Sequence, residues 1–175
     1  MTGIRPAVPG DIDAIMAIEQ TAFDPERRAS RRSLVRALGS ARQIVMVCES
    51  AGRVVGYAIL WRFEHTWRLY SIATDPAVQG GGVGTGLLEA AIAAARGGGA
   101  RWLQLEARPA PALTNWYAKH GFRPIATLSD YYGPGDDAVR MRLCFRRDVQ
   151  RGRQPAPTGT STAKKKALQG GPSAI

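Results

Sequence analysis

The segment that most constrains this sequence is a glycine run that follows a predicted strand and opens a predicted helix. Five glycines fall within residues 80–86, after Asp75-Pro76 and before the apolar pair Leu87-Leu88. Glycine lets the backbone approach a ligand closely, and a helix that begins inside such a run presents unpaired N–H groups at the positive end of its dipole. This combination favours binding of phosphate oxygens by main-chain amides.

Two common phosphate-binding motifs do not fit the residues around this run. No Lys-Ser/Thr pair follows the glycines, as the loop of a nucleoside triphosphatase would require. The run also lacks the spacing of a dinucleotide-binding loop, and no βαβ unit surrounds the first strand of the chain. A flexible turn without any ligand is the alternative, and the position of the run after the third strand of a meander disfavours it.

Hydrophobic periodicity predicts one α/β (α+β) domain with a mixed, mostly antiparallel central sheet flanked by helices on both faces. The strand–helix–strand connection over residues 67–107 requires one parallel pair of strands in an otherwise antiparallel sheet. A polar loop is expected at 130–135, between the last two strands. The predicted strands are 3–7, 43–49, 54–63, 67–74, 102–107, 122–128 and 139–145, and the predicted helices are 11–19, 31–38, 83–96 and 111–120.

The basic charge of the chain is concentrated at its end. The formal net charge is +10, and from Arg146 onward seven basic residues face one acid, Asp148. The composition there, rich in Gly, Pro, Ser, Thr and Ala, does not favour a packed core. We therefore expect a folded domain over 1–146 and a basic, disordered tail over 147–175. The lysines at 164–166 leave contact with nucleic acid or an anionic surface open for the tail alone.

Other composition signals mainly exclude classes of protein. No run approaches the roughly 18 apolar residues of a membrane span, and the first residues lack the apolar core of a secretory signal. A cytoplasmic location without a membrane partner is therefore expected. Cys48 and Cys144 each lie in an apolar stretch and are expected to be buried, and His65 and His120 show no ligand spacing. Metal dependence is not expected.

Several segments, taken in order, resemble one enzyme family. Residues 69–76, together with the pattern Gln79-x-x-Gly82-x-Gly84, resemble the cofactor strand and pyrophosphate motif of the GNAT N-acetyltransferases. Further segments resemble the ribosomal-protein-alanine N-acetyltransferase type of that family: residues 105–108 (LEAR), 115–122 (NWYAKHGF), Tyr131-Tyr132, Asp137-Ala138 and Met141.

The resemblance implies an acyl-CoA N-acyltransferase fold and acetyl-CoA as the co-substrate. Main-chain groups of Ile72, Ala73 and Thr74 are then expected to pair with the pantetheine arm and to polarise the thioester carbonyl. The expected pyrophosphate-binding residues are Gln79, Gly80, Gly81, Gly82, Val83, Gly84 and Thr85. The family usually has an asparagine after the segment that matches 105–108; Arg108-Pro109-Ala110 stands there instead, which leaves that cofactor contact without an assigned residue.

Two residues are candidates for proton transfer. Glu106 alternates with the apolar Leu105 in a strand beside the cofactor strand, where the family subgroup has its general base. Tyr117 precedes Gly121-Phe122, at the position where the resemblance implies a general acid that protonates the coenzyme thiolate. An ion-paired glutamate and a core tyrosine are the alternatives.

The acceptor amine is the least constrained part of the function. The resemblance implies a protein or peptide N-terminus, or a lysine, as acceptor; a small-molecule amine and a non-catalytic CoA-binding module are the alternatives. A basic protein is a poor trap for polycations, which disfavours a polyamine. Segments 23–25, 64–67 and 130–132 are expected to rim the acceptor groove, or else to be plain surface.

Overall fold

The structure, a computed structural model, describes residues 2–145, so the predicted tail over 147–175 lies outside the described residues. The order of elements predicted from the sequence is confirmed. The strands are β1 Thr2–Pro6, β2 Gln43–Ser50, β3 Arg53–Arg62, β4 Thr66–Thr74, β5 Trp102–Ala107, β6 Arg123–Gly133 and β7 Asp136–Cys144. The helices are α1 Ile12–Ala22, α2 Arg31–Leu38, α3 Val83–Gly97 and α4 Pro111–Lys119, with short 3-10 turns at η1 Pro9–Asp11, η2 Pro25–Arg27 and η3 Pro76–Val78.

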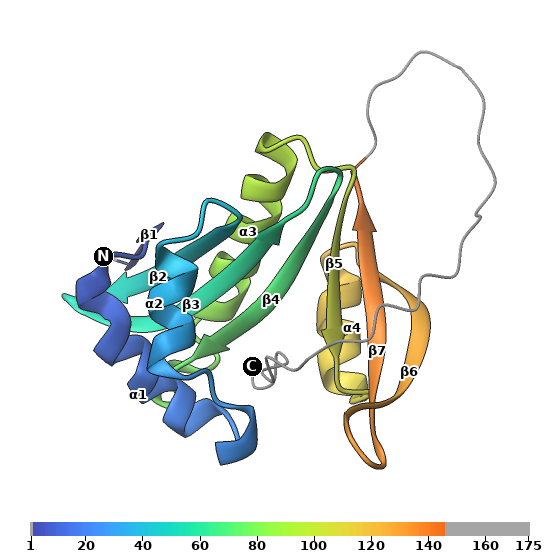
Figure 1. Cartoon of the computed structure of the whole chain (residues 1–175), viewed down its shortest axis with the longest axis horizontal. Helices are drawn as coiled ribbons and strands as arrows, with labels where there is room; N and C mark the ends of the chain where they lie inside the picture. Colours follow the sequence, from blue (N-terminus) through green and yellow to red (C-terminus); the bar gives the residue numbers. More distant parts are fainter. Residues whose placement is uncertain (1, 146–175) are drawn as a thin grey trace.

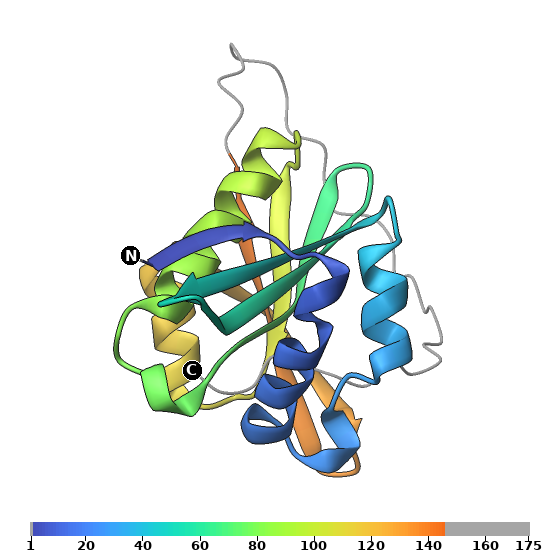
Figure 2. The ribbon, with the colours of Figure 1, turned by 90° about the vertical axis from the view of Figure 1, so that its left-hand side faces the viewer.

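The strands form one mixed sheet in the order β1-β2-β3-β4-β5-β7-β6 (Figure 1). Only β4 and β5 are parallel in the described chain, as the crossover through α3 requires. Figure 2 shows the sheet lying between α3 on one side and α1 and α2 on the other. The predicted mixed, mostly antiparallel sheet flanked by helices is therefore confirmed.

The centre of the sheet is buried on both faces because α3 covers one face and α1 with α2 covers the other. Leu87, Leu88, Ala91 and Ala95 of α3 are fully buried on the first face, as their helical spacing predicts. Neighbouring residues of β4 belong to different cores: Ile72 packs with α3, and Ala73 packs with α1 and α2. This alternation fixes which groups of β4 face which side.

Two local predictions are wrong. The segment 130–135 is not a loop, because β6 continues to Gly133 and β7 begins at Asp136, joined by a tight turn in which Gly135 has a φ of +74°. Bulges interrupt the pairing of these strands, which hides their alternation in the sequence. Cys144 is exposed at the end of β7, while Cys48 is buried as expected.

A buried polar network ties α1 to β4. Glu19 of α1 is almost fully buried, and one of its carboxylate oxygens accepts the N–H of Ala29 at 2.7 Å. The other carboxylate oxygen accepts the hydroxyl of Tyr57, which lies 3.0 Å from the hydroxyl of Ser71 in β4. Burial raises the pKa of the Glu19 carboxyl above its ordinary value. The network fixes the α1–α2 connection against β4.

Replacing Glu19 by alanine is expected to lower the free energy of unfolding by about 2–4 kcal/mol, because the Ala29 N–H and the Tyr57 hydroxyl lose their acceptors in the core. Glu19→Gln keeps an acceptor and has no charge to bury, so a change within about 1 kcal/mol is expected at pH 7. Urea unfolding of both variants measures the difference.

The pH dependence of Glu19→Gln gives a second test. A carboxyl whose native pKa lies above its unfolded value stabilises the fold below the unfolded pKa, and this contribution is lost as the pH rises through the native pKa. The glutamine variant is therefore expected to gain stability relative to the parent protein as the pH rises above about 4.3, the unfolded pKa of glutamate. Equal losses for Ala and Gln at every pH would contradict this account.

Candidate active site

The loop between β4 and α3 is built from a capped turn followed by glycines in left-handed conformation. Asp75 caps η3 by accepting the N–H of Ala77 at 2.9 Å. Gly80 and Gly82 both have φ of +80°, a conformation that other residues adopt only with strain. Open space lies where a Cβ would stand at either position. The glycines therefore let the chain turn sharply into α3. They also leave the start of α3 bare, meaning that no side chain of Gly80 or Gly82 covers it.

Main-chain donors gather at the start of α3. The first intrahelical bond of α3 runs from the N–H of Gly86 to the carbonyl of Gly82 at 2.9 Å. The amides of Val83, Gly84 and Thr85 precede that bond and have no acceptor within the helix. The predicted donor Gly81 differs, because its N–H is directed to the carbonyl of Val78 at 3.2 Å. The remaining donors form an anion-binding helix start.

β4 and β5 separate after a short paired stretch, as Figure 1 shows. They pair only between 66–68 and 102–104, so the rest of each strand runs without the other in the described chain. The N–H of Asp75 is bonded to β3, and main-chain groups alternate along a strand. Ile72 and Thr74 therefore direct their main-chain N–H and C=O groups towards β5. Ala73, between them, directs its N–H and C=O groups to β3.

Tyr70 is an extra residue in the pairing of β4 with β3, since Leu69 and Ser71 face consecutive residues of β3. Such a bulge reorients the main chain and is common beside active sites. On the other side of Ile72, the hydroxyl of Thr74 is buried without a partner among the described residues. The free edge of β4 therefore offers both main-chain groups and a side-chain hydroxyl to a ligand.

Glu106 lies on the face of β5 opposite the core that contains Leu105 and α3, as the alternation with Leu105 predicts. Its carboxylate is almost completely buried between two guanidinium groups, one from each side. Arg68 of β4 lies 2.6 Å from Oε2 of Glu106, and Nε of Arg140 in β7 lies 2.9 Å from Oε1. The three side chains together carry a net positive charge.

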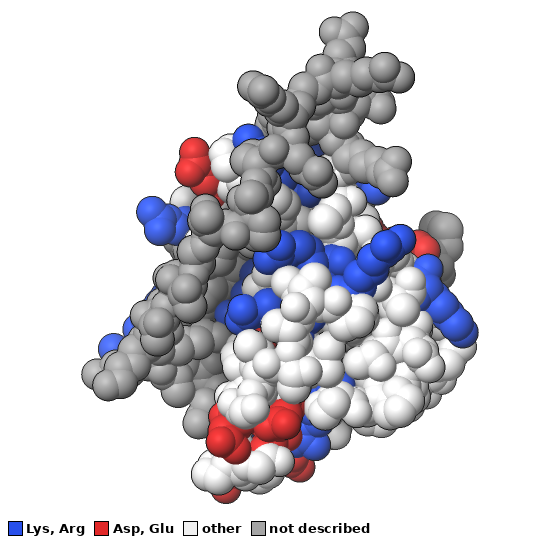
Figure 3. All heavy atoms as spheres, turned by 90° about the vertical axis from the view of Figure 1, so that its right-hand side faces the viewer, with Lys and Arg blue, Asp and Glu red and all other residues white. Residues whose placement is uncertain are grey.

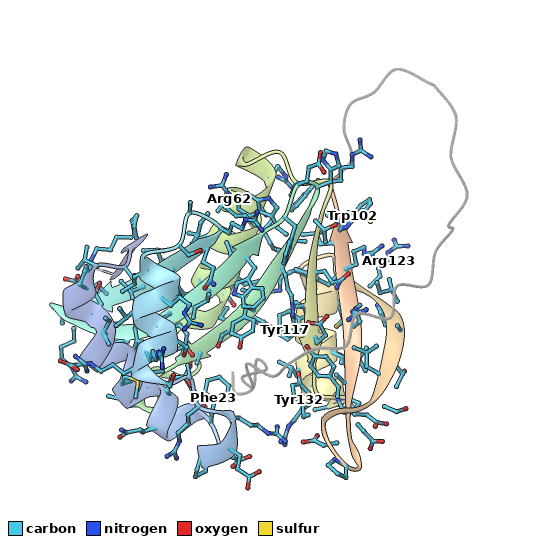
Figure 4. All side chains as sticks on the ribbon, viewed as in Figure 1. Phe23, Arg62, Trp102, Tyr117, Arg123 and Tyr132 are labelled. Carbon is cyan, nitrogen blue, oxygen red and sulfur yellow. The ribbon has the colours of Figure 1, made fainter. Side chains whose placement is uncertain are left out.

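Tyr117 is fully buried, and its hydroxyl has no hydrogen-bond partner among the described residues. Burial, with a smaller contribution from Tyr132, raises the pKa of the Tyr117 phenol far above its usual value, so it stays protonated. Tyr132 donates its hydroxyl to the main-chain oxygen of Glu106 at 3.1 Å. Figure 4 shows Tyr117 and Tyr132 on the β5 side of the space where β4 and β5 separate, with Phe23 facing it from the end of α1.

The α1–α2 connection and the β6–β7 hairpin meet at the open end of this region. Arg27 of η2 forms an ion pair with Asp136 of β7 and lies over the ring of Tyr132. Arg108 approaches both Asp136, at 3.4 Å, and Asp24, at 3.8 Å. The predicted rim segments 23–25 and 130–132 therefore lie at this end.

The third predicted rim segment, 64–67, lies elsewhere. It forms the turn at the paired end of β4, where Thr66 faces Trp102 of β5. Trp67 is buried, and its ring packs against Gly98 at the end of α3. This segment closes the far end of the sheet and does not rim the open end.

Tyr132, predicted only as part of a rim segment, lies beside both predicted catalytic residues: its hydroxyl binds the main chain of Glu106, and it contributes to the raised pKa of Tyr117. The sequence analysis missed the two arginines beside Glu106, Arg68 and Arg140. Arg68 and Arg140 come from strands on either side of β5, and a single strand pattern does not reveal which side chains meet across strands. Asn115, the first asparagine after the segment that matches 105–108, is exposed on α4. Within residues 2–145 no group of three or more metal-binding side chains comes together, and no helix is long and apolar enough to cross a membrane.

Comparison with known proteins places this arrangement among acetyltransferases. A sequence model described as "Acetyltransferase (GNAT) domain" matches residues 41–124. An N-alpha-acetyltransferase of Sulfurisphaera tokodaii is 31% identical over 153 residues, which cover 79% of this chain and 90% of that protein. An uncharacterized protein of Mycobacterium leprae, ML0378, is 32% identical over 139 residues, and the match covers 77% of this chain but only 38% of that longer relative.

Solved structures give the same picture. The ribosomal-protein-S18-alanine N-acetyltransferase of Escherichia coli superposes with a TM-score of 0.79 at 25% identity, over 88% of this chain and 100% of that one. A putative acetyltransferase of Salmonella typhimurium, solved with its cofactor acetyl-CoA, superposes with a TM-score of 0.72 at 26% identity, over 87% of this chain and 98% of that one.

Proposed function

Since this chain belongs to the GNAT family of N-acetyltransferases, we propose that it transfers the acetyl group of acetyl-CoA to the α-amine of a protein or peptide N-terminus. The observation that supports this most strongly is a convergence at one place of three features. They are the bare start of α3, the free edge of β4, and two buried groups, the unpartnered Tyr117 hydroxyl of α4 and the Glu106 carboxylate of β5.

The residues present fit acetyl-CoA. Buried hydroxyls without partners, on Thr74 and Tyr117, indicate a site designed for groups from outside the chain. We assign the diphosphate to the amides of residues 82–85, with Gln79, Gly80 and Gly81 shaping the loop, and the pantetheine arm to the main-chain groups of Ile72 and Thr74 on either side of Ala73. When bound, acetyl-CoA supplies an acetyl group activated as a thioester.

Glu106 is proposed as the proton acceptor for the incoming amine. Arg68 and Arg140 hold its carboxylate in one orientation, and their charge disfavours a second cation at the same place. An ammonium group that enters this field therefore loses its proton more readily. The nucleophile must be a neutral amine. The arginines favour loss of the proton from an ammonium group, and the Glu106 carboxylate accepts that proton.

Tyr117 is proposed as the proton donor on the other side of the reaction. Its phenol stays protonated because burial disfavours the charged phenolate. The hydroxyl has no internal partner to give up, so it is free to donate to the departing sulfur as negative charge develops there. Tyr132, whose hydroxyl binds the Glu106 main chain, lies near both proposed proton-transfer groups.

The positive surroundings of Glu106 favour an α-amine over a lysine as acceptor. With reference pKa values near 8 and 10.4, about a quarter to two fifths of α-amines but only about 0.1% of lysines are neutral at pH 7.5. Nearby guanidinium groups also repel polyamines and other polycations. Incubation with acetyl-CoA and peptides that begin with Ala, Ser or Met, followed by mass spectrometry, tests the proposal. An acetyl group found only on lysines or small amines would contradict it.

Gly82→Ala tests the assignment of the glycine loop. The positive φ of Gly82 makes alanine strained by about 1 kcal/mol or more, and relief of that strain turns the first amides of α3 away. We expect at least a tenfold rise in the Kd for acetyl-CoA by calorimetry, about 1.4 kcal/mol. Gly97→Ala, at the other end of α3 in open space, is the matched control and should leave the Kd unchanged.

A further inference from the structure

A strip of arginines continues from Glu106 along the β6–β7 hairpin. Arg140 lies opposite Glu106 in the pairing of β5 with β7, and Arg142 lies opposite Gln104. Arg123 of β6 is in turn the direct partner of Arg142. Met141, between the two β7 arginines, points into the core, so both arginines project on the face that carries Glu106.

The outer part of this strip lacks negative charge. The Glu106 carboxylate is already held by Arg68 and Arg140. Arg142 donates only to the neutral Gln104, at 3.0 Å, and its Nε is buried without a partner among the described residues. Within residues 2–145 no carboxylate lies within ion-pair distance of Arg123 or Arg142. Like charges directly opposite each other destabilise a sheet, so a bound anion would relieve a real cost here.

The other end of the hairpin has the opposite charge. Asp130, Asp136 and Asp137 lie where β6 turns into β7. Figure 3 shows these two zones on one side of the molecule, a blue band across the middle and red side chains at the lower end. The charged side chains along the hairpin therefore change from aspartates at the turn, where Asp136 is paired with Arg27 and Arg108, to unpaired arginines at the other end of the described hairpin. An acceptor amine at Glu106, followed by negative side chains that extend towards Arg142, complements this arrangement.

We propose, as an extension of the proposed function, that the acceptor is an N-terminal segment with acidic side chains at about its second to fourth residues. Arg142 and Arg123 bind these carboxylates while the α-amine lies at Glu106. Arg142 lies two residues along β7 from Arg140, about 7 Å, which an extended peptide covers in two residues. Guanidinium groups bind carboxylates with two parallel hydrogen bonds, which gives both strength and direction.

The experiment compares matched peptides that begin Ala-Glu-Glu-Glu, Ala-Gln-Gln-Gln and Ala-Lys-Lys-Lys and are otherwise identical. The enzyme is the full chain, and kcat/KM is measured by thiol release with acetyl-CoA. We expect at least tenfold preference for the Glu over the Gln peptide at low salt, smaller at 0.5 M salt. In the double variant Arg123→Gln/Arg142→Gln the preference should fall to about twofold, with the Gln peptide's kcat/KM nearly unchanged. Arg32→Gln, exposed on α2, is the control and should keep the preference.

The outcomes separate this proposal from the proposed function. Equal rates on the three peptides, or a preference that survives the double variant, would overturn the acidic acceptor and leave the N-terminal acetyltransferase intact. No acetylation of any peptide, despite a thermal shift with acetyl-CoA, would overturn the proposed function itself. Loss of affinity for a 20-nucleotide poly-U RNA with unchanged peptide preference would identify the strip as a nucleic-acid surface and also overturn the proposal. A melting curve of the double variant, unchanged within about 3 °C, shows that the variant is folded for the comparison.

Discussion

Tyr117→Phe is expected to lower kcat by about 10²–10³-fold and to leave the KM for acetyl-CoA within about twofold. The substitution removes one oxygen and keeps the ring that packs between α4 and the sheet. If the hydroxyl donates to the leaving sulfur, its loss affects the transition state and not the binding of the ground state. Steady-state kinetics with a saturating acceptor peptide measure both constants.

Tyr117→Phe should not lose stability, although it loses activity. The Tyr117 hydroxyl is buried without a partner among the described residues, so its removal should leave the free energy of unfolding unchanged or raise it by up to about 1 kcal/mol. Tyr57→Phe is the matched control: it removes a buried hydroxyl that is hydrogen-bonded to Glu19 and Ser71. It should cost about 1–2 kcal/mol and leave kcat within about threefold. A Tyr117→Phe variant with full turnover would exclude the proton-donor role.

Glu106→Gln is expected to reduce kcat/KM for the acceptor peptide by about 10²-fold or more, with little change in acetyl-CoA affinity. Glutamine keeps the shape of the side chain but removes the proton acceptor and the negative charge between Arg68 and Arg140. The residual rate should rise with pH until the acceptor α-amine is neutral without help. A pH–rate profile on one peptide measures this.

Stability must be measured beside the kinetics, because the same carboxylate also holds the sheet together. Removing one partner of a buried ion pair costs about 3–5 kcal/mol; here Arg140 is a third exposed and glutamine keeps one acceptor, so we expect about 1–3 kcal/mol. Rates are therefore compared at a temperature at which both proteins are fully folded. A variant that is less stable yet turns over at the full rate would identify Glu106 as a structural ion-pair residue only.

Local sequence signals determine the part of the site that lies within one connection. The glycine run, the apolar stripe of α3 and the alternation of Leu105 with Glu106 are short-range patterns, and the structure has them where the sequence predicts. The β4–α3–β5 crossover follows from the same patterns because a parallel pair requires it. The position of Tyr117 beside β5 follows from α4 being the next element.

Contacts between distant strands could not be predicted in this way. Arg140 meets Glu106 only because β7 lies beside β5, an order that periodicity does not specify. The β4–β5 pair is predicted, but the pattern does not specify that Arg68 of β4 meets Glu106. Bulges in β6 shift its alternation, so the segment with Tyr132 looks like a polar loop in the sequence. The separation of β4 from β5 also leaves no signal in the sequence, since both segments keep a strand pattern beyond the three residues over which they pair.

The most direct test of the account is a crystal structure of the chain with acetyl-CoA bound. We expect diphosphate oxygens at about 3 Å from the amide nitrogens of Gly82, Val83, Gly84 and Thr85, and the sulfur within hydrogen-bond reach of the Tyr117 hydroxyl. A coenzyme whose diphosphate binds away from the start of α3, with these amides turned to water, would contradict the account at its centre.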